Sequence, residues 1–116
     1  MIPLSQYIEQ RIDVLNQLDH EMARRHELRN SDSHDPQTRQ AAVDQLRQAR
    51  DAADQRLFDL FAIRSAKLAT PQVTAHADAA WMRLLAAWQN VVGLLDQPLS
   101  PETQRISDLL DESATT

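Results

Sequence analysis

The chain has 116 residues, a formal net charge of −5 and no cysteine. The lack of cysteine excludes disulfides, thiolate catalysis and cysteine-based zinc or iron–sulfur sites. The net negative charge disfavours wholesale binding to nucleic acid, and no apolar run approaches the ~18–20 residues of a membrane span. Because the apolar fraction is an ordinary 42%, we predict one globular domain over residues 1–112 with a frayed tail at 113–116.

The composition also indicates where the protein acts. The N-terminus lacks the basic-then-apolar pattern of a signal peptide, so we expect a cytoplasmic protein. Arginine outnumbers lysine eleven to one, which we interpret as the composition of a GC-rich bacterial or phage genome.

Prolines mark the expected helix starts. Proline suits the first helical turn because its missing N–H would have no partner there and its φ angle already fits a helix. Little interrupts the segments between these prolines, since the only glycine is Gly93. The pattern predicts an all-α bundle of four helices. The prolines are Pro3, Pro36, Pro71 and Pro101, and the last three follow Asp35, Thr70 and Ser100, whose side chains can cap a helix.

The first helix is predicted over residues 3–29. Its apolar residues recur at spacings of three and four, which is typical of one face of an amphipathic helix. A turn is predicted over 30–35, where residues that hydrogen-bond their own backbone are dense. The apolar face consists of Leu4, Ile8, Ile12, Leu15, Leu18 and Met22.

The second helix is predicted over residues 36–69 and becomes more apolar along its length. Ala49 and Ala53 allow close approach of a neighbour, so we expect the first two helices to form a long antiparallel hairpin. Near residue 60 apolar groups occur on more than one side, because Phe58 begins a second stripe beside that of Leu57 and Leu60.

The third helix, predicted over 71–95, is the most hydrophobic. Trp81, Leu84 and Trp88 belong to a seam of alternating three- and four-residue spacing. Asp78 and Arg83 are the only formally charged residues between 72 and 95. A helix that is apolar nearly all round is buried in a core or in an interface. A short fourth helix from Pro101 to about residue 112 is expected to pack as a strap across the bundle.

The length of the second helix raises the question of association. Unbroken over 36–69, it would measure about 51 Å at ~1.5 Å per residue, whereas a compact domain of this size has a diameter of roughly 35 Å. We therefore predict a homodimer or a complex with another protein; the alternative is that the aromatic residues fill one monomeric core. The residues predicted to contact the partner are Phe58, Phe61, Trp81, Leu84, Leu85, Trp88 and Val92.

The sequence lacks a convincing catalytic pattern. His20-Glu21-Met22-Ala23-Arg24 resembles the zinc-protease pattern HExxH, but arginine replaces the second histidine. One glycine cannot form a glycine-rich phosphate loop. We therefore expect no enzymatic activity, no metal and no cofactor.

The remaining hypotheses concern binding. We favour a small non-enzymatic regulator that binds another protein stoichiometrically and blocks or redirects it, as antiactivators, immunity proteins and phage antagonists do. One alternative is a secretion- or flagellar-type chaperone or scaffold. A second alternative is a DNA-binding regulator that uses the arginine-bearing second helix, although interleaved acidic residues make nucleic-acid binding the less favoured interpretation.

Overall fold

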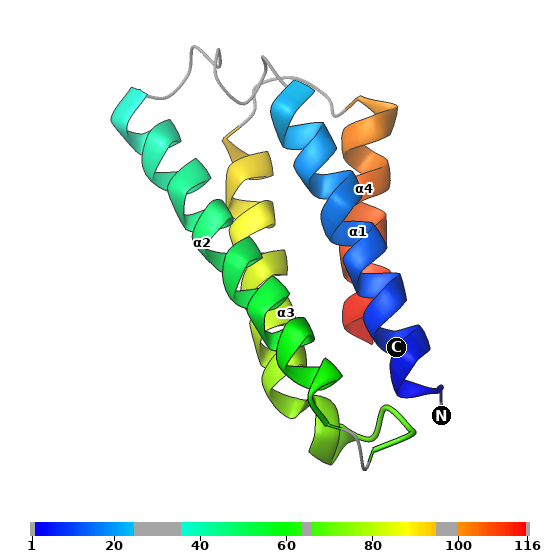
Figure 1. Cartoon of the computed structure of the whole chain (residues 1–116). Coiled ribbons are helices and arrows are strands. Elements are labelled where there is room, and N and C mark those ends of the chain that lie inside the picture. The colour runs from blue at the N-terminus through cyan, green and yellow to red at the C-terminus, as the bar shows by residue number, and fades with distance from the viewer. Residues whose placement is uncertain (1, 25–35, 64–65, 95–99, 116) are drawn as a thin grey trace.

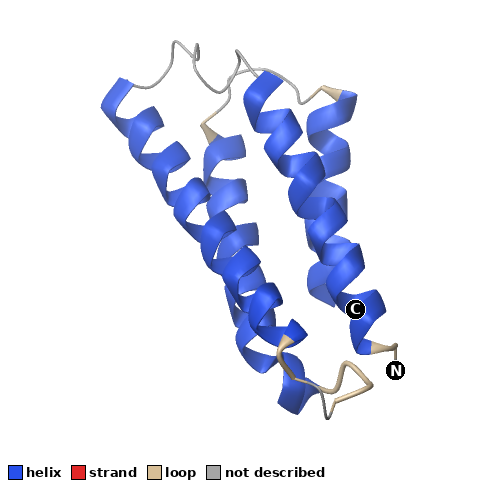
Figure 2. Cartoon of the chain, viewed as in Figure 1, coloured by secondary structure: helices blue, strands red, loops and turns tan. Residues whose placement is uncertain are grey.

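The chain forms a bundle of four helices that alternate in direction (Figure 1). The computed structural model describes residues 2–24, 36–63, 66–94 and 100–115. The helices are α1 (Leu4–Arg24), α2 (Pro36–Phe61), α3 (Pro71–Gly93) and α4 (Pro101–Thr115). Helix dominates these segments, and no β-strand occurs in them (Figure 2). The predicted all-α fold is confirmed.

The helices pack in a ring, each against its neighbours in the sequence, and α4 closes the ring against α1. Among these four packed pairs, α2 and α3 have the most extensive contact and α1 and α2 the least. Helix α4 runs alongside α1 and α3 (Figure 1), so its description as a strap across the bundle is wrong. No helix in the described ranges has the length and hydropathy needed to cross a bilayer.

Helices α2, α3 and α4 begin at the predicted prolines. Of the predicted N-cap residues, Ser100 and Thr70 are described, and they behave differently. The Ser100 side-chain oxygen accepts a hydrogen bond from the Thr103 amide at 3.3 Å, as an N-cap residue should. Thr70 has the extended backbone of an N-cap but makes no side-chain cap bond. Its carbonyl accepts instead from the amides of Val73 and Thr74, both at 3.0 Å. Asp35 lies outside the described residues.

Helix α2 ends at Phe61, eight residues before its predicted end. The amides of Ala62 and Ile63 turn back onto carbonyls three residues earlier, which tightens and ends the helix. The chain beyond then pairs with the N-terminal segment through an isolated bridge between Pro3 and Leu68. This pairing satisfies backbone groups that a longer helix would have used internally, so it replaces helix after residue 61.

The bridge has two backbone hydrogen bonds. The Leu4 amide donates to the Lys67 carbonyl at 2.9 Å, and the Ala69 amide donates to the Ile2 carbonyl at 3.0 Å. The connection between α2 and α3 is thereby fixed at the start of α1.

The shorter α2 removes the length argument for a second chain. Its 26 residues span about 39 Å at ~1.5 Å per residue, within a body whose longest extent is 50 Å. Two other boundaries differ from prediction: α3 ends at Gly93 and α4 continues to Thr115. The predicted first-helix residues 25–29 and Leu95 lie outside the described residues.

The core runs along the axis of the bundle and draws on all four helices. Leu18, Leu46, Leu84 and Leu110, one from each helix, are fully buried. Burial of such side chains stabilises the fold by about 1.5–3 kcal/mol each. Two charged residues of α1 are also buried, Arg11 at the centre of its apolar face and Glu21 near its C-terminal end.

Candidate functional site

The seven residues predicted to contact a partner fall into two groups. Trp81, Leu84, Leu85 and Trp88 are buried in the core of the chain itself, whereas Phe58 and Phe61 are 57% and 56% exposed. Val92 is half-buried against the core. The chain's own helices therefore cover most of the apolar surface of α3, and a partner has access chiefly to the two phenylalanines.

The two tryptophans are satisfied core residues. The Trp81 indole N–H donates to the Leu110 carbonyl at 3.1 Å, and the Trp88 indole N–H donates to the Ser107 hydroxyl at 2.7 Å. A buried indole needs such a partner for its N–H. Both hydrogen bonds join α3 to α4. Helix α4, which was predicted to be short and to carry few apolar residues, therefore covers both tryptophans.

Phe58 and Phe61 form an aromatic pair on the surface of α2. Their ring centroids lie 6.0 Å apart with the planes tilted by 60°, a favourable edge-to-face type of geometry. The core side of α2 is already occupied by Leu57 and Leu60. Each phenylalanine follows one of these leucines and is rotated about 100° from it around the helix, which turns it away from the core.

The ion pair between Arg50 on α2 and Asp19 on α1 shows that Phe58 and Phe61 lie on the side of α2 near α1. The Arg50 guanidinium bonds the Asp19 carboxylate at 2.9 Å and 2.8 Å through two nitrogens. Phe58 follows Arg50 by eight residues, about 12 Å, and Ile12 precedes Asp19 by seven, about 10.5 Å. Because the helices are antiparallel, the half-buried Ile12 on α1 comes level with Phe58 on α2.

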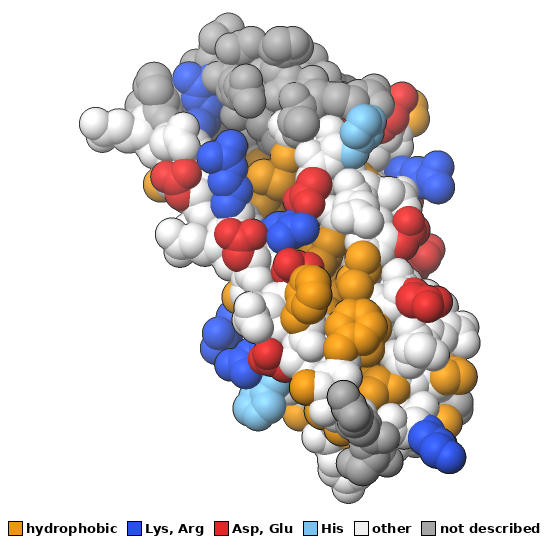
Figure 3. Space-filling model, in the orientation of Figure 1, with side chains coloured by type: hydrophobic (Ala, Val, Ile, Leu, Met, Phe, Trp, Pro, Cys, Tyr) orange, Lys and Arg blue, Asp and Glu red, His pale blue; other side chains and the backbone are white. Residues whose placement is uncertain are grey.

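Figure 3 shows hydrophobic side chains gathered in a band between α2 and α1, in the half of the bundle that holds the C-terminal end of α2. Ile63 and Leu68, in the connection after α2, are also exposed. We call the set of Ile12, Phe58, Phe61, Ile63 and Leu68 the phenylalanine surface. Prediction from the sequence missed three of its members, because Ile63 and Leu68 were assigned to a longer helix and Ile12 to the core face.

Carboxylates accompany this surface. Asp54 lies one turn before Phe58 on the same side of α2, and Asp51 lies a further turn back. Both are within salt-bridge range of Arg50, at 3.5 Å and 3.4 Å respectively. Burial lowers the pKa of Arg50, but the hydrogen bond and charge of Asp19 and the neighbouring carboxylates outweigh it and raise that pKa overall. Arg50 thus remains a cation shared among several acids.

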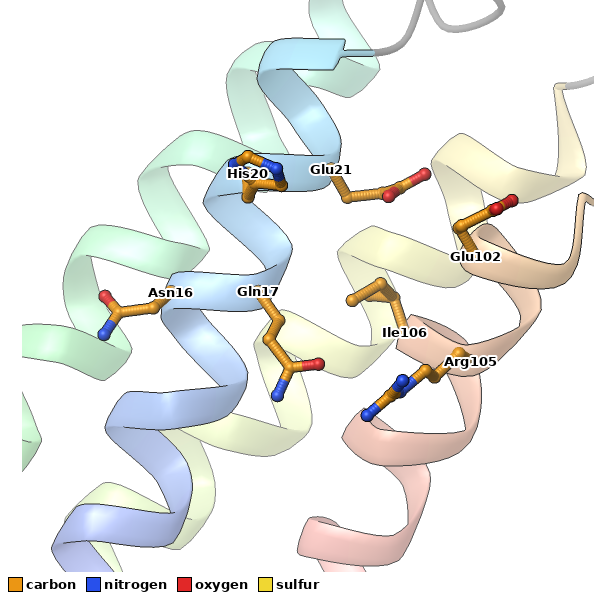
Figure 4. Close-up of a pocket in the computed structure, with 7 residues that line it drawn as sticks. All are labelled: Asn16, Gln17, His20, Glu21, Glu102, Arg105 and Ile106. Atoms are coloured by element: carbon orange, nitrogen blue, oxygen red, sulfur yellow. The ribbon is translucent and has the colours of Figure 1, made fainter.

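A second candidate is a hollow of about 390 Å³ between α1 and α4. Glu21 and Glu102 lie at one end of it, Gln17 and Arg105 reach toward each other at the other, and Ile106 lies between (Figure 4). Asn16 and His20 complete the lining. The buried Glu21 carboxylate accepts a hydrogen bond from Thr103 at 3.4 Å. No group of three or more metal-binding side chains occurs in the described part of the chain.

A partly buried polar network joins α1 to α3. The Tyr7 hydroxyl donates to Asp78, whose other oxygen accepts from the Thr74 hydroxyl at 2.8 Å. The Arg11 guanidinium lies 3.6 Å from the Tyr7 ring centroid and 5.8 Å from that of Trp81. A cation over aromatic faces in a desolvated site is stabilised by the ring quadrupoles.

This network also reaches the end of α4. Arg11 donates to the Ser113 carbonyl at 2.6 Å, which places a cation at the C-terminal end of a helix, where the helix dipole favours it. The sequence held a signal for the network, because Arg11 interrupts the apolar face of α1 between Ile8 and Leu15 and Asp78 is one of two formal charges within the third predicted helix. The network links α1, α3 and α4 in the interior, so its role is structural.

Comparisons of this chain with protein-family models, with curated proteins and with solved structures found no match.

Proposed function

We propose that this chain is a small non-enzymatic regulatory protein of the cytoplasm that binds another protein stoichiometrically through the phenylalanine surface and blocks or redirects it. The supporting observation is the paired exposure of Phe58 and Phe61 beside an otherwise closed core. Exposed aromatic residues that lie together are typical anchors of protein interfaces. Burying both rings against a partner would remove two large apolar side chains from water.

The pairing of arginines with carboxylates on α2 gives little support to the alternative of a DNA-binding regulator. Arg50 is shared by Asp19, Asp51 and Asp54, and Arg56 lies 3.9 Å from Asp59. Guanidinium groups paired in this way are less available for phosphate than the concentrated basic face of a recognition helix. A chaperone or scaffold would use the same surface and differs in its effect on the bound protein.

The experiment compares three forms of the chain. A double substitution, Phe58→Ser with Phe61→Ser, removes the aromatic pair, and Met82→Ser serves as the matched control because Met82 is 52% exposed on α3. Each form is used to capture partners from a bacterial extract after cross-linking. We expect a protein that wild type and the Met82 variant retain and the double variant loses, and that saturates at a fixed ratio with purified chain.

The effect on the captured protein then separates the hypotheses. A regulator changes the activity of its target on titration, whereas a chaperone changes the solubility of its client. A chain that captures nothing in a Phe58- and Phe61-dependent way, and that remains monomeric by light scattering, contradicts the proposed function.

A further inference from the structure

The chemistry around the phenylalanine surface indicates what kind of partner it fits. The surface lies along the seam between α1 and α2, the neighbouring helices that contact each other least, and we call this seam the groove between α1 and α2. The groove is bounded at one end by the Arg50–Asp19 ion pair and at the other by the Pro3–Leu68 bridge. From Leu4 to Asp19 this distance is about 22 Å, which corresponds to roughly four turns of helix.

The spacing of Ile12, Phe58 and Phe61 in the phenylalanine surface matches the apolar face of a partner helix. Ile12 and Phe58 lie at one level of the groove, and Phe61 lies one turn further along α2. A partner helix needs an apolar stripe with residues spaced at i, i+3, i+4 and i+7 to contact successive levels. Its backbone groups are satisfied internally, so it does not require hydrogen bonds from α1 or α2.

The charges along the groove are predominantly negative. Glu9 is exposed and lies three residues before Ile12, on the same side of α1. On α2, Asp54 and Asp51 precede Phe58 by four and seven residues. Lys67 is exposed at the far end, near the bridge. The Arg50 guanidinium is shared by three of these carboxylates, those of Asp19, Asp51 and Asp54. The exposed Glu9 adds a further acidic group on the α1 side.

This charge distribution distinguishes between possible occupants. A second copy of the chain would bring the same carboxylates to the interface, and like charges facing each other oppose association. A segment with lysine or arginine beside its apolar stripe would instead meet charges of opposite sign. Such complementarity speeds encounter and excludes wrong partners.

We propose that the groove between α1 and α2 binds an amphipathic helix of about four turns that carries basic residues beside its apolar stripe. This inference rests on the proposed function and specifies the partner's chemistry. The apolar stripe covers Ile12, Phe58 and Phe61, and the basic residues lie against Glu9, Asp51 and Asp54.

The test uses three synthetic 18-residue peptides and fluorescence anisotropy. The first has a leucine stripe flanked by lysine, the second has the same stripe flanked by glutamate, and the third has the composition of the first in scrambled order. We expect the first peptide to bind at least tenfold more tightly than either of the others. Its affinity should fall as salt is raised from 50 to 500 mM, because salt screens exposed charges.

Variants of the chain locate the binding. The double substitution Phe58→Ser with Phe61→Ser should weaken binding of the basic peptide at least tenfold, and Met82→Ser should leave it unchanged. Glu9→Lys should weaken it about threefold or more without affecting the aromatic pair. Far-UV circular dichroism of each variant checks that the helices are intact, which we expect because all these side chains are exposed.

The outcomes separate this inference from the function on which it rests. If the glutamate-flanked peptide binds as tightly as the basic one and the phenylalanine substitutions abolish both, the charge inference is overturned while binding through the surface stands. Self-association that depends on Phe58 and Phe61, without peptide binding, overturns the basic-helix partner in favour of a second copy. Equal binding of the basic peptide to wild type and the double variant overturns the groove as its site.

Discussion

Removal of one hydroxyl tests the polar network inside the bundle. In Tyr7→Phe the ring remains over Arg11, so the packing and the cation–π contact are kept, but Asp78 loses a hydrogen-bond donor. Thr74 still donates to that carboxylate at 2.8 Å. A hydrogen bond to a charged group contributes about 1.5–3 kcal/mol, so we expect the free energy of unfolding to fall by about 2 kcal/mol at pH 7. For a domain of this size that corresponds to a decrease of roughly 8 °C in Tm.

The same substitution should alter the pH dependence of stability. Burial of the phenol and its hydrogen bond to Asp78 raise the pKa of Tyr7, although the charge of Arg11 opposes this. The unfolded chain then releases the proton near pH ~10, while the folded chain holds it. The stability from this group is therefore present in full below pH ~10. It is lost as pH rises further, by up to about 1.4 kcal/mol per pH unit.

Urea denaturation followed by circular dichroism at 222 nm, from pH 7 to 11.5, measures both effects. Wild type should lose stability above pH 10 more steeply than Tyr7→Phe. Because Tyr7 is the only tyrosine, absorbance at 295 nm reports its ionisation directly. If the variant unfolds at the same urea concentration as wild type at pH 7, and the two decline in parallel above pH 10, the hydroxyl does not support Asp78 as described.

Two further substitutions probe the core and the contact between α1 and α2. Trp88→Ala should lower the free energy of unfolding by roughly 3–5 kcal/mol, because it empties a fully buried site; a loss below about 1 kcal/mol in urea denaturation would place Trp88 outside the core. Arg50→Gln should cost about 1 kcal/mol or less, because its ion pair with Asp19 is partly exposed. A double-mutant cycle with Asp19→Asn should give a coupling that shrinks in 1 M salt, and a coupling of zero at low salt would contradict the pairing.

The helices could be predicted because their signals are local. Pro36, Pro71 and Pro101 each fix a backbone angle and remove a donor that a helix start does not need, and the structure begins a helix at each. The end of α2 could not be predicted in this way. Residues 62–69 favour helix locally, but Leu4 and Lys67 pair across 63 positions of sequence, a competition that no local pattern reveals.

The sequence likewise could not show which aromatic residues are buried in the chain's own core and which are exposed. An apolar helix face has the same periodicity whether it is covered by its own chain or by another, so Trp81 and Phe58 could not be told apart. The difference comes from α4, which covers the tryptophans: its Leu110 carbonyl and Ser107 hydroxyl accept hydrogen bonds from the indoles of Trp81 and Trp88. None of the four described helices covers Phe58, which is exposed. Its prediction as a contact residue still awaits experiment.

The polar network described above also determines how this architecture would be recognised in another chain. Leucine, isoleucine and methionine replace one another readily in a core if volume is kept. The identities of the apolar residues therefore do not identify this fold in another sequence. A phenol that donates to a carboxylate and carries a guanidinium over its ring allows no such exchange. The spacing Tyr-x3-Arg near the beginning of α1, together with Thr-x3-Asp-x2-Trp in α3, is therefore the pattern that we expect another chain with this same polar network to carry.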